Sequence, residues 1–361
     1  MILLVFIIIV GYILSKIYFT VFKNNLFEFL FTYSLIIILT GFVTYTPDWA
    51  GYDAWVRQGS GRDIFFNYLI DIISPDGYKQ IHIIFTTVYS LLLLFFITRF
   101  SKHTLLITLL YIPIIYLYYT TQIRFFMGYY SLWLGFYLWY VNNNKKTAII
   151  FIVFAIANHL SLIILLPIIY FLKDSINSFH KKVIWALIFL TFGYFFVFNL
   201  LQYVIPQSTP FLNYILLAEF DSSILGGLFS FLPAIIGIYL VYKYLTKKLK
   251  HNEELSTDKK IQFLYRLSIT PVIFISIALN RQIVGHRFII PALLYQLLLI
   301  IYIATKYNTR KQNFNLVGFI FLYFLFYLNY IYIISPIVVG NEITKKVSLM
   351  LNSNSIIGHW F

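Results

Sequence analysis

The sequence predicts an all-α integral membrane protein with about ten or eleven transmembrane helices, and two observations predict it. Of its 361 residues, 60% are hydrophobic and only 11% are charged, whereas a soluble domain carries about a quarter charged residues. Apolar runs long enough to cross a bilayer recur from one end of the chain to the other. No charge-rich stretch is long enough to fold as a separate soluble domain, so we expect residues 1–361 to form a single membrane domain.

Hydropathy places ten helices along the chain. Their expected ranges are 1–22, 26–44, 81–98, 104–120, 124–141, 183–203, 225–242, 262–280, 287–305 and 314–334. The run from Met1 to Val10 has no basic residue before it and no small-residue cleavage site after it. We therefore interpret it as a retained first helix and not as a signal peptide.

The chain is basic, with a formal charge of +14 from 27 Lys and Arg against 13 Asp and Glu. In a soluble protein this excess would suggest a nucleic-acid partner. Here the lysines fall between apolar spans, as in the cytoplasmic loops of membrane proteins, so the expected partner is the lipid bilayer and not nucleic acid. The chain has no cysteine, which excludes disulfides, thiolate chemistry and cysteine-ligated metals.

The charges of the loops give the expected orientation. The segment 45–80 has more acidic than basic residues: Asp48, Asp53, Asp63, Asp71 and Asp76 against Arg57, Arg62 and Lys79. The loop 243–260 has six lysines, and the short links at 99–102, 145–146 and 306–311 are also basic. Because cytoplasmic loops are enriched in Lys and Arg, we expect 45–80 outside, 243–260 inside and both termini outside.

The apolar segment 147–172 does not fit a simple crossing. One straight crossing would put Lys173, Lys181 and Lys182 outside, and the lysine-rich loop 243–260 with them. Two crossings need about 40 residues, more than the segment contains. We therefore predict a broken or re-entrant segment, with the break at the polar pair Asn158-His159. Irregular backbone at membrane depth needs protein or water around it, so we also expect a cavity near His159.

Charged and polar side chains within apolar segments are costly to insert, so each calls for a functional hypothesis. Arg124 opens a predicted helix at its outer end; the alternative is that its side chain extends to the lipid headgroups. His159 lies in the middle of an apolar segment, where a lone histidine is more often a hydrogen-bonded packing residue than a catalyst. Both alternatives stay open for both residues.

A second group lies between two predicted helices on the outer side, where Arg281, His286 and Arg287 fall within seven residues. Outer loops are otherwise poor in Arg, so this pair is unusual. Two guanidinium groups and an imidazole suit a phosphate or pyrophosphate, which Arg holds through two parallel hydrogen bonds. The acidic loop 45–80 adds three aromatic residues, Trp49, Tyr52 and Trp55. They form either part of the interfacial aromatic belt or a platform for sugar rings.

The motifs of several common enzymes and transporters are missing. The sequence has no Walker loop, no zinc-binding HExxH and no GxSxG nucleophile elbow. Neither half of the chain resembles the other closely enough to indicate an inverted transporter repeat. The basic and polar groups gather on one side of the membrane, and no charged relay runs through it. This distribution favours an outward-facing enzyme over a conduit.

Five stretches, in this order, carry a resemblance to a known family. They are Asp48-Trp49-Ala50-Gly51-Tyr52 with Arg62-Asp63-Ile64-Phe65-Phe66, then Gln122-Ile123-Arg124-Phe125-Phe126-Met127-Gly128, then Ala155-Ile156-Ala157-Asn158-His159-Leu160-Ser161, and Gly285-His286-Arg287-Phe288. Over roughly residues 40–300 the chain resembles the EpsG/Wzy-like family of bacterial polysaccharide polymerases, which includes O-antigen and capsule repeat-unit polymerases. Where that family often has Gln after its Arg, this chain has Phe125.

The resemblance implies a GT-C-like, metal-independent glycosyltransferase without a cofactor. It would lie in the bacterial inner membrane, with its active site facing the periplasm or exterior. Its partners would be two undecaprenyl-diphosphate-linked oligosaccharides, a donor and an acceptor, and a chain-length regulator protein is a further candidate. Such an enzyme would serve lipopolysaccharide or capsule biosynthesis.

That chemistry gives each candidate residue a role. A diphosphate leaving group needs charge stabilisation more than protonation, and the candidates for it are Arg124, Arg281, Arg287 and His286. The attacking hydroxyl needs a general base, and His159 is the first candidate because the unperturbed pKa of histidine lies near neutrality. Asp48 or Asp53 is the second candidate for the base. The sugar rings would stack on Trp49, Tyr52 and Trp55.

Two functions of other classes stay open, because a fold alone does not determine function. A flippase for lipid-linked oligosaccharides would use the same arginines to bind diphosphate without cleaving it. It would have more spans, pseudo-symmetric halves and charges along a central path. A membrane sugar O-acyltransferase has a similar size and span count, but its outward histidine site would be served by a cytoplasmic acyl donor.

Overall fold

The computed structural model describes residues 25–59, 63–73, 77–204, 224–307, 323–334 and 342–358. These residues form helices and no β-strand, apart from one isolated bridge between Val43 and Asn354, which confirms the all-α class. The predicted helix 1–22, residues 314–322 of the last predicted helix, and Arg62 and Asp76 of the outer loop lie outside the described residues.

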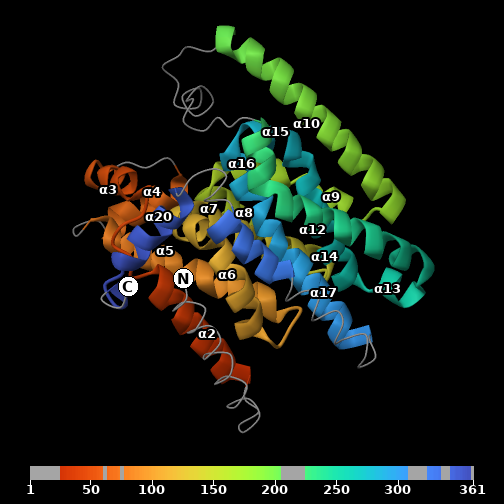
Figure 1. The fold of residues 1–361 in the computed structure, drawn as a ribbon, viewed down its shortest axis with the longest axis horizontal. Helices are drawn as coiled ribbons and strands as arrows, with labels where there is room; N and C mark the ends of the chain where they lie inside the picture. The colour runs from red at the N-terminus through yellow and green to blue at the C-terminus, as the bar shows by residue number, and fades with distance from the viewer. Residues whose placement is uncertain are drawn as a thin grey trace. The chain divides into compact units, whose positions relative to one another are not determined.

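The chain divides into two compact units, residues 1–166 with 304–361 and residues 167–303, whose helices are labelled in Figure 1. The first unit contains α2 (Asn25–Thr40), α3 (Trp49–Arg57), α4 (Ile64–Ile73), α5 (Tyr78–Thr98), α6 (Thr104–Thr121), α7 (Ile123–Tyr140), α8 (Lys145–Asn158), the 3₁₀ helix η2 (Leu160–Leu165), an apolar helix at Tyr323–Ile334 that ends in the π-turn η6 (Tyr330–Ile334), and α20 (Glu342–Asn352). The second unit contains α9 (Ile168–Phe171), α10 (Ile176–Val204), α12 (Ile224–His251), α13 (Glu253–Thr257), α14 (Lys259–Ile269), η4 (Thr270–Phe274), α15 (Ile275–Asn280), α16 (Gln282–Phe288), η5 (Ile290–Ala292) and most of α17 (Leu293–Tyr307).

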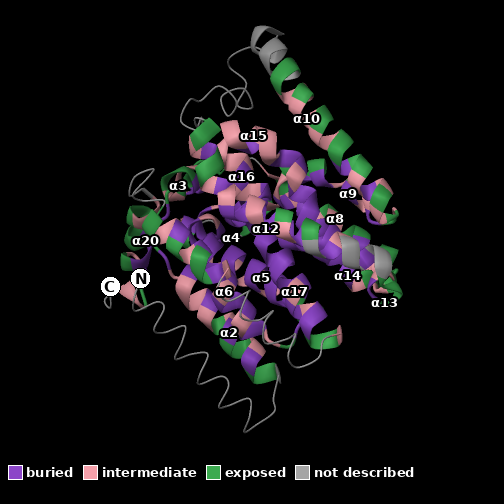
Figure 2. Cartoon of the chain, turned by 45° about the vertical axis from the view of Figure 1, so that its right-hand side comes forward, coloured by how far each residue is buried: buried purple, intermediate pink, exposed green. Residues whose placement is uncertain are grey.

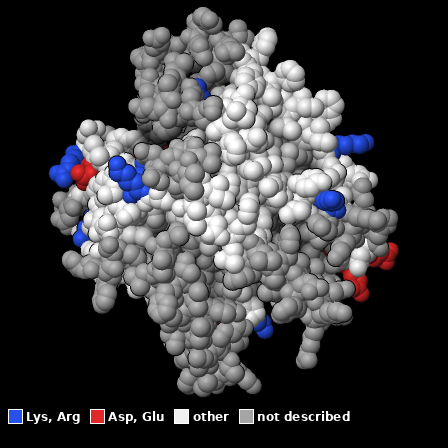
Figure 3. Space-filling model, viewed as in Figure 1, with Lys and Arg blue, Asp and Glu red and all other residues white. Residues whose placement is uncertain are grey.

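Six helical segments of the described chain are long and apolar enough to cross a membrane. They are Tyr78–Thr98, Thr104–Thr121, Ile176–Phe196, Ile224–Lys243, Lys259–Asn280 and Gln282–Tyr307. The expected helix at 124–141 also forms, as α7, although its many Tyr and Trp side chains make it less apolar. The chain is thus a multi-pass membrane protein. On the face shown in Figure 3, most of the described surface carries no charged side chain, as expected where a protein contacts lipid.

The packing of α7 against α8 depends on two glycines. A Cβ at Gly128 would lie 2.7 Å from the carbonyl oxygen of Ala155, and one at Gly135 would lie 3.0 Å from that of Ala148. Between them, the Ser131 hydroxyl donates to the carbonyl of Phe151 over 2.8 Å. Small residues let two membrane helices approach closely where lipid provides no hydrophobic force between them. As a result, every residue of α7 from 123 to 137 is buried, and Figure 2 shows the neighbouring α5 and α6 largely buried as well.

Two polar side chains close helix ends inside the first unit. The N-cap residue of α6, His103, makes no side-chain cap hydrogen bond, and instead the N–H of Leu105 donates to the Glu28 carboxylate of α2 over 3.0 Å. At the other end of α2, the Asn354 amide donates to the carbonyl of Ile38 over 2.7 Å. The last carbonyls of a helix have no partner within it, so the C-terminal segment supplies one for α2.

The predicted break in the segment 147–172 is confirmed. Helix α8 ends at Asn158, His159 adopts an extended backbone with φ −157° and ψ 104°, and η2 begins at Leu160. The expected cavity beside the break stays a prediction.

In the second unit, the start of α10 meets the lysine-rich end of α12 and α14. His180 Nε2 lies 2.8 Å from the hydroxyl of Tyr265, and the His180 ring lies 5.2 Å from that of Tyr242. Lys173, Lys181 and Lys182 and the loop 243–260 therefore lie at the same end of this unit. The re-entrant course of 147–172 and its side of the membrane stay predictions.

The orientation predicts a labelling pattern in sealed cells. Because the chain has no native cysteine, single cysteines report accessibility directly. An impermeant maleimide should label Gly51→Cys from outside and should leave Lys250→Cys and Lys173→Cys unlabelled until the membrane is opened. Labelling of position 250 but not of position 51 from outside would reverse the orientation. Labelling of 51, 173 and 250 together would show one full crossing at 147–172 and contradict the re-entrant segment.

The close packing of α7 predicts that Gly128→Ala destabilises the protein. The added Cβ would also lie 2.5 Å from Leu162 Cδ1, and such overpacking costs about 1–3 kcal/mol. Gly193→Ala is the matched control, because a Cβ there meets nothing within 4 Å and alanine favours a helix by up to about 1 kcal/mol. Thermal unfolding of both purified variants provides the comparison. Equal unfolding temperatures would show that α7 and α8 are not held at this distance.

Candidate functional site

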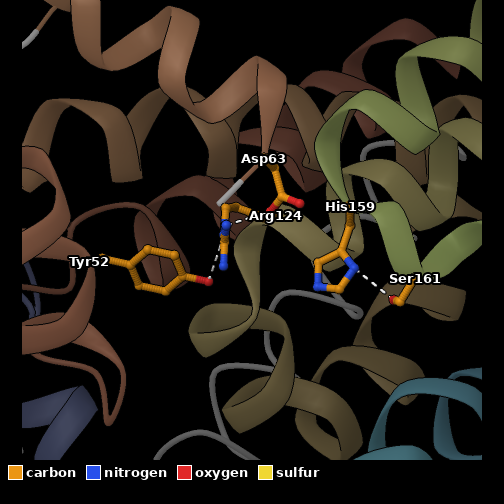
Figure 4. Close-up of polar contacts among 5 residues, drawn as sticks. All are labelled: Tyr52, Asp63, Arg124, His159 and Ser161. Atoms are coloured by element: carbon orange, nitrogen blue, oxygen red, sulfur yellow. Dashed lines mark hydrogen bonds and ion pairs between the residues drawn. The ribbon is translucent and has the colours of Figure 1, made fainter. Parts of the chain in front are cut away.

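Arg124 lies in the first turn of α7, where the residue as a whole is 6% exposed. Helix α6 ends at Thr121 and α7 begins at Ile123, with Gln122 between them in a non-helical conformation. The Nη1 group of Arg124 forms an ion pair with the Asp63 carboxylate, and its Nε donates to the Tyr52 hydroxyl over 3.3 Å (Figure 4). The guanidinium is therefore held by the two short helices of the outer loop, α3 and α4, and is not extended towards headgroups.

Three aromatic rings surround the same guanidinium. Its Cζ atom lies 5.0 Å from the ring centre of Tyr52, 4.9 Å from that of Trp55 and 5.2 Å from that of Phe66. A cation over an aromatic face gains about 0.5–2 kcal/mol, with the larger values where water is excluded. We call Tyr52, Trp55, Asp63 and Phe66 the arginine box. It holds a full positive charge in a place that is almost closed to water.

Helix α3 is fixed to the start of α5, which positions the box. Tyr52 stacks on Tyr78 with ring centres 4.9 Å apart and planes at 9°. Gly77, which precedes α5, has no side chain to cap the helix and has a positive φ of 85°. The Asp53 carboxylate takes the capping role and accepts from the N–H of Tyr78 over 3.4 Å.

Asp53 is engaged by a second partner, Arg57, whose Nε donates to the carboxylate over 2.7 Å. This hydrogen bond, more than the N–H of Tyr78, holds the pKa of Asp53 below its ordinary value, against an opposing effect of burial. A carboxylate with a lowered pKa is a weaker proton acceptor, which favours a structural role for Asp53. Asp48 lies exposed at the N-terminus of α3, and its side chain makes no capping hydrogen bond.

His159 projects from the break after α8. Its backbone N–H donates to Ala155 and its carbonyl accepts from Leu162, over 3.1 and 3.0 Å, so the backbone joins the two helices. Its Nδ1 lies 2.7 Å from the Ser161 hydroxyl (Figure 4). Phe125 meets the imidazole edge to face, with ring centres 5.4 Å apart and planes at 86°. The ring of this half-buried side chain is thus held on two sides.

The first turn of α7 links the arginine box to His159. Arg124 enters the box while its neighbour Phe125 contacts the His159 ring. Helix α4 also reaches α8, through the rings of Phe65 and Phe154 at 5.0 Å. A cation, a carboxylate and an imidazole therefore gather around one helix start.

The remaining basic candidates belong to the second unit. Arg281 has an extended backbone between α15 and α16, and its Nε donates to the Tyr194 hydroxyl over 3.1 Å. His286 lies in the last turn of α16 with its ring 5.4 Å from that of Phe231. Arg287 lies in the same turn, and all three basic side chains are half-buried. Each of these side chains is therefore partly packed against the protein and partly accessible.

The structure brings together Tyr52, Trp55 and Arg124 from the sequence candidates, and it adds three residues without a predicted role. Asp63 and Phe66 complete the arginine box, and Ser161 contacts His159. A buried arginine requires a counter-charge, and that rule indicates one of the loop aspartates without saying which. Within the described residues, no three His, Asp or Glu side chains are arranged to hold a metal ion.

Comparison with known proteins gives one match. A family model described as the EpsG family matches residues 29–343, from α2 to the first turn of α20. No curated protein and no solved structure matches the chain.

Proposed function

Because the chain belongs to the EpsG family, we propose that it is a polysaccharide polymerase of the bacterial inner membrane. It joins oligosaccharide repeat units that are carried on undecaprenyl diphosphate, on the outer face of the membrane, for O-antigen or capsule. The growing chain leaves its lipid carrier and is transferred to the terminal sugar of a fresh lipid-linked unit. The observation that carries the proposal is the start of α7, where Arg124 lies in its box and the neighbouring Phe125 contacts the imidazole of His159.

The reaction breaks the bond between the donor sugar and a diphosphate oxygen. That oxygen gains negative charge as the bond breaks, and a guanidinium that is already oriented stabilises it without rearrangement. Arg124 is suited to this role because the rings of Tyr52 and Trp55 lie against its guanidinium. The low exposure of the site strengthens the interaction, since little water screens it.

The acceptor hydroxyl forms the new bond and must lose its proton, and His159 is the proposed base. For Nε2 to accept that proton, Nδ1 must carry one, and the Ser161 hydroxyl at 2.7 Å is placed to accept its hydrogen bond. Such a partner holds the tautomer and steadies the imidazolium that forms, as second-shell groups do in other histidine sites. Ser161 is thus a positioning residue.

Arg281, His286 and Arg287 of the second unit are also proposed to bind diphosphate. All three are half-buried, and Arg281 donates to the Tyr194 hydroxyl. Trp49 and Trp55, which are half-buried at the edge of α3, are the proposed surfaces for sugar rings. Tyr52 is 6% exposed and stacked on Tyr78, so its proposed contribution is to hold Arg124.

The proposal predicts that His159→Gln abolishes chain extension. Glutamine keeps a hydrogen-bonding group but cannot accept a proton at neutral pH, and loss of general-base assistance costs about a hundred- to ten-thousandfold in rate. The measurement is extension of synthetic lipid-linked repeats by the purified variant, with binding of a single repeat unit as the check on folding.

His103→Gln, at the start of α6, is the control and should keep normal turnover. Near-normal turnover of His159→Gln would remove the base role from His159. A protein that moves lipid-linked units across a vesicle membrane but extends none would be a flippase and would contradict the polymerase itself.

The basic residues of the second unit predict a graded loss. Arg287→Lys keeps the charge but loses the planar fork, so it should lower activity if the phosphate contact is bidentate. Arg287→Ala and Arg281→Ala should lower it further, at unchanged membrane abundance. Polysaccharide length on gels provides the measurement, and Arg99→Ala, exposed at the end of α5, is the control. A normal long-chain ladder from both alanine variants would remove these residues from the site.

A further inference from the structure

The Arg124–Asp63 ion pair differs from the other ion pairs of the described chain in its burial. The side chains of Arg124 and Asp63 are 8% and 10% exposed. In the pairs Arg57–Asp53 and Lys182–Asp174 the cation is 73% and 44% exposed. A buried ion pair is seldom more stabilising than an apolar replacement, because both charges lose their hydration. Stability alone therefore gives no reason for this pair.

The two partners are held unequally. Arg124 lies on α7, in a run of fully buried residues, and its guanidinium is enclosed by the three rings of the arginine box. Asp63 lies at a bend directly before α4, in the outer loop. The cation is fixed by α7 and by the rings of Tyr52 and Trp55 on α3, which stacks on α5, whereas the anion directly precedes α4. The carboxylate is thus the partner that can be exchanged.

Carboxylate and phosphate oxygens bind a guanidinium through the same charge-assisted geometry. We propose that Asp63 occupies, in the free protein, the anion position that a diphosphate oxygen takes in the substrate complex. The proposal rests on the proposed role of Arg124. Asp63 cannot stay beside an incoming diphosphate, because like charges at contact distance repel strongly in a poorly hydrated site. Binding is therefore an exchange, in which Asp63 leaves Arg124 and α4 loosens from the site, while Tyr52 and Trp55 of α3 stay against the guanidinium.

The exchange has a consequence for selectivity. A neutral lipid or a free sugar cannot replace Asp63, since Arg124 would then be left buried without a counter-charge. Only a ligand that brings its own anion opens the loop. Asp63 thus acts as a positioning residue that restricts the site to ligands with phosphate or diphosphate groups.

The first test is binding of inorganic pyrophosphate, without divalent cations, to purified protein by calorimetry. Asp63→Asn removes the competing charge, so its affinity for pyrophosphate should rise by about tenfold or more over the wild type. Asp71→Asn is the matched control: it removes the same charge from the same loop, at an exposed position on α4. Its affinity should stay within about twofold of the wild type. An unchanged or weaker affinity in Asp63→Asn would overturn the proposal, since a purely structural aspartate would give that result.

A second measurement covers the case in which Asp63→Asn fails to fold. Ile70 is 1% exposed on α4, so Ile70→Cys with Asp63 intact reports loosening of α4. Pyrophosphate should increase its rate of maleimide labelling, and an unchanged rate would contradict the exchange. Arg124→Gln separates this proposal from the function it rests on. If Arg124→Gln binds pyrophosphate as the wild type does, the role of Arg124 fails. If it loses binding while Asp63→Asn gains none, only the exchange fails.

Discussion

The arrangement of the loop 45–80 in the first unit depends on one constraint, the free-energy cost of burying the positive charge of Arg124 at the start of α7. Arg124 is drawn out of water by α7, and a guanidinium in that position needs an anion and hydrogen-bond acceptors around it. The outer loop supplies them from two short helices, Tyr52 and Trp55 from α3 and Asp63 and Phe66 from the start of α4. The two short helices of that loop thus pack around one side chain. The stack of Tyr52 on Tyr78 also fixes α3 against α5.

Helix α7 carries both parts of the candidate site because of how closely it meets α8. Gly128 and Gly135 bring the two backbones together, and the polar Asn158 lies directly over Gly128, with its Cβ 3.4 Å from where a Cβ of that glycine would be. Helix α8 then ends, and the extended backbone of His159 turns the imidazole towards Phe125. The interhelical contact of two small residues thereby determines where a titratable ring lies relative to the helix start that bears Arg124.

The sequence predicts those features that depend on a single segment of the chain, such as the position of a helix or of a break in it. Hydropathy located the helices, and the shortage of residues in 147–172 predicted the break at His159. Sequence patterns do not identify the partner of a side chain from a distant segment. A buried Arg124 needs a counter-ion, but the segment 45–80 holds five aspartates that are equivalent in sequence. The sequence therefore did not single out Asp63. The first residue of a helix also differs from the one that hydropathy predicts. The helix expected from 262 begins at Lys259, because the Asp258 carboxylate accepts from the N–H groups of Lys260 and Ile261, a capping interaction that hydropathy does not detect.

The closure of α2 by the C-terminal segment has a consequence for how the chain is made. Besides the bond from Asn354 to Ile38, the Thr44 hydroxyl donates to the carbonyl of Ser353 over 2.6 Å, and the N–H of Ser355 donates to Phe42 over 3.0 Å. These partners are separated by some three hundred residues, with the whole second unit between them. During translation Asn354 leaves the ribosome after the whole second unit, so α2 stays incompletely capped while the second unit is synthesised. Membrane insertion of α2 and completion of its C-terminal end are therefore separate events, and a nascent chain arrested before residue 354 would be integrated with α2 uncapped at that end.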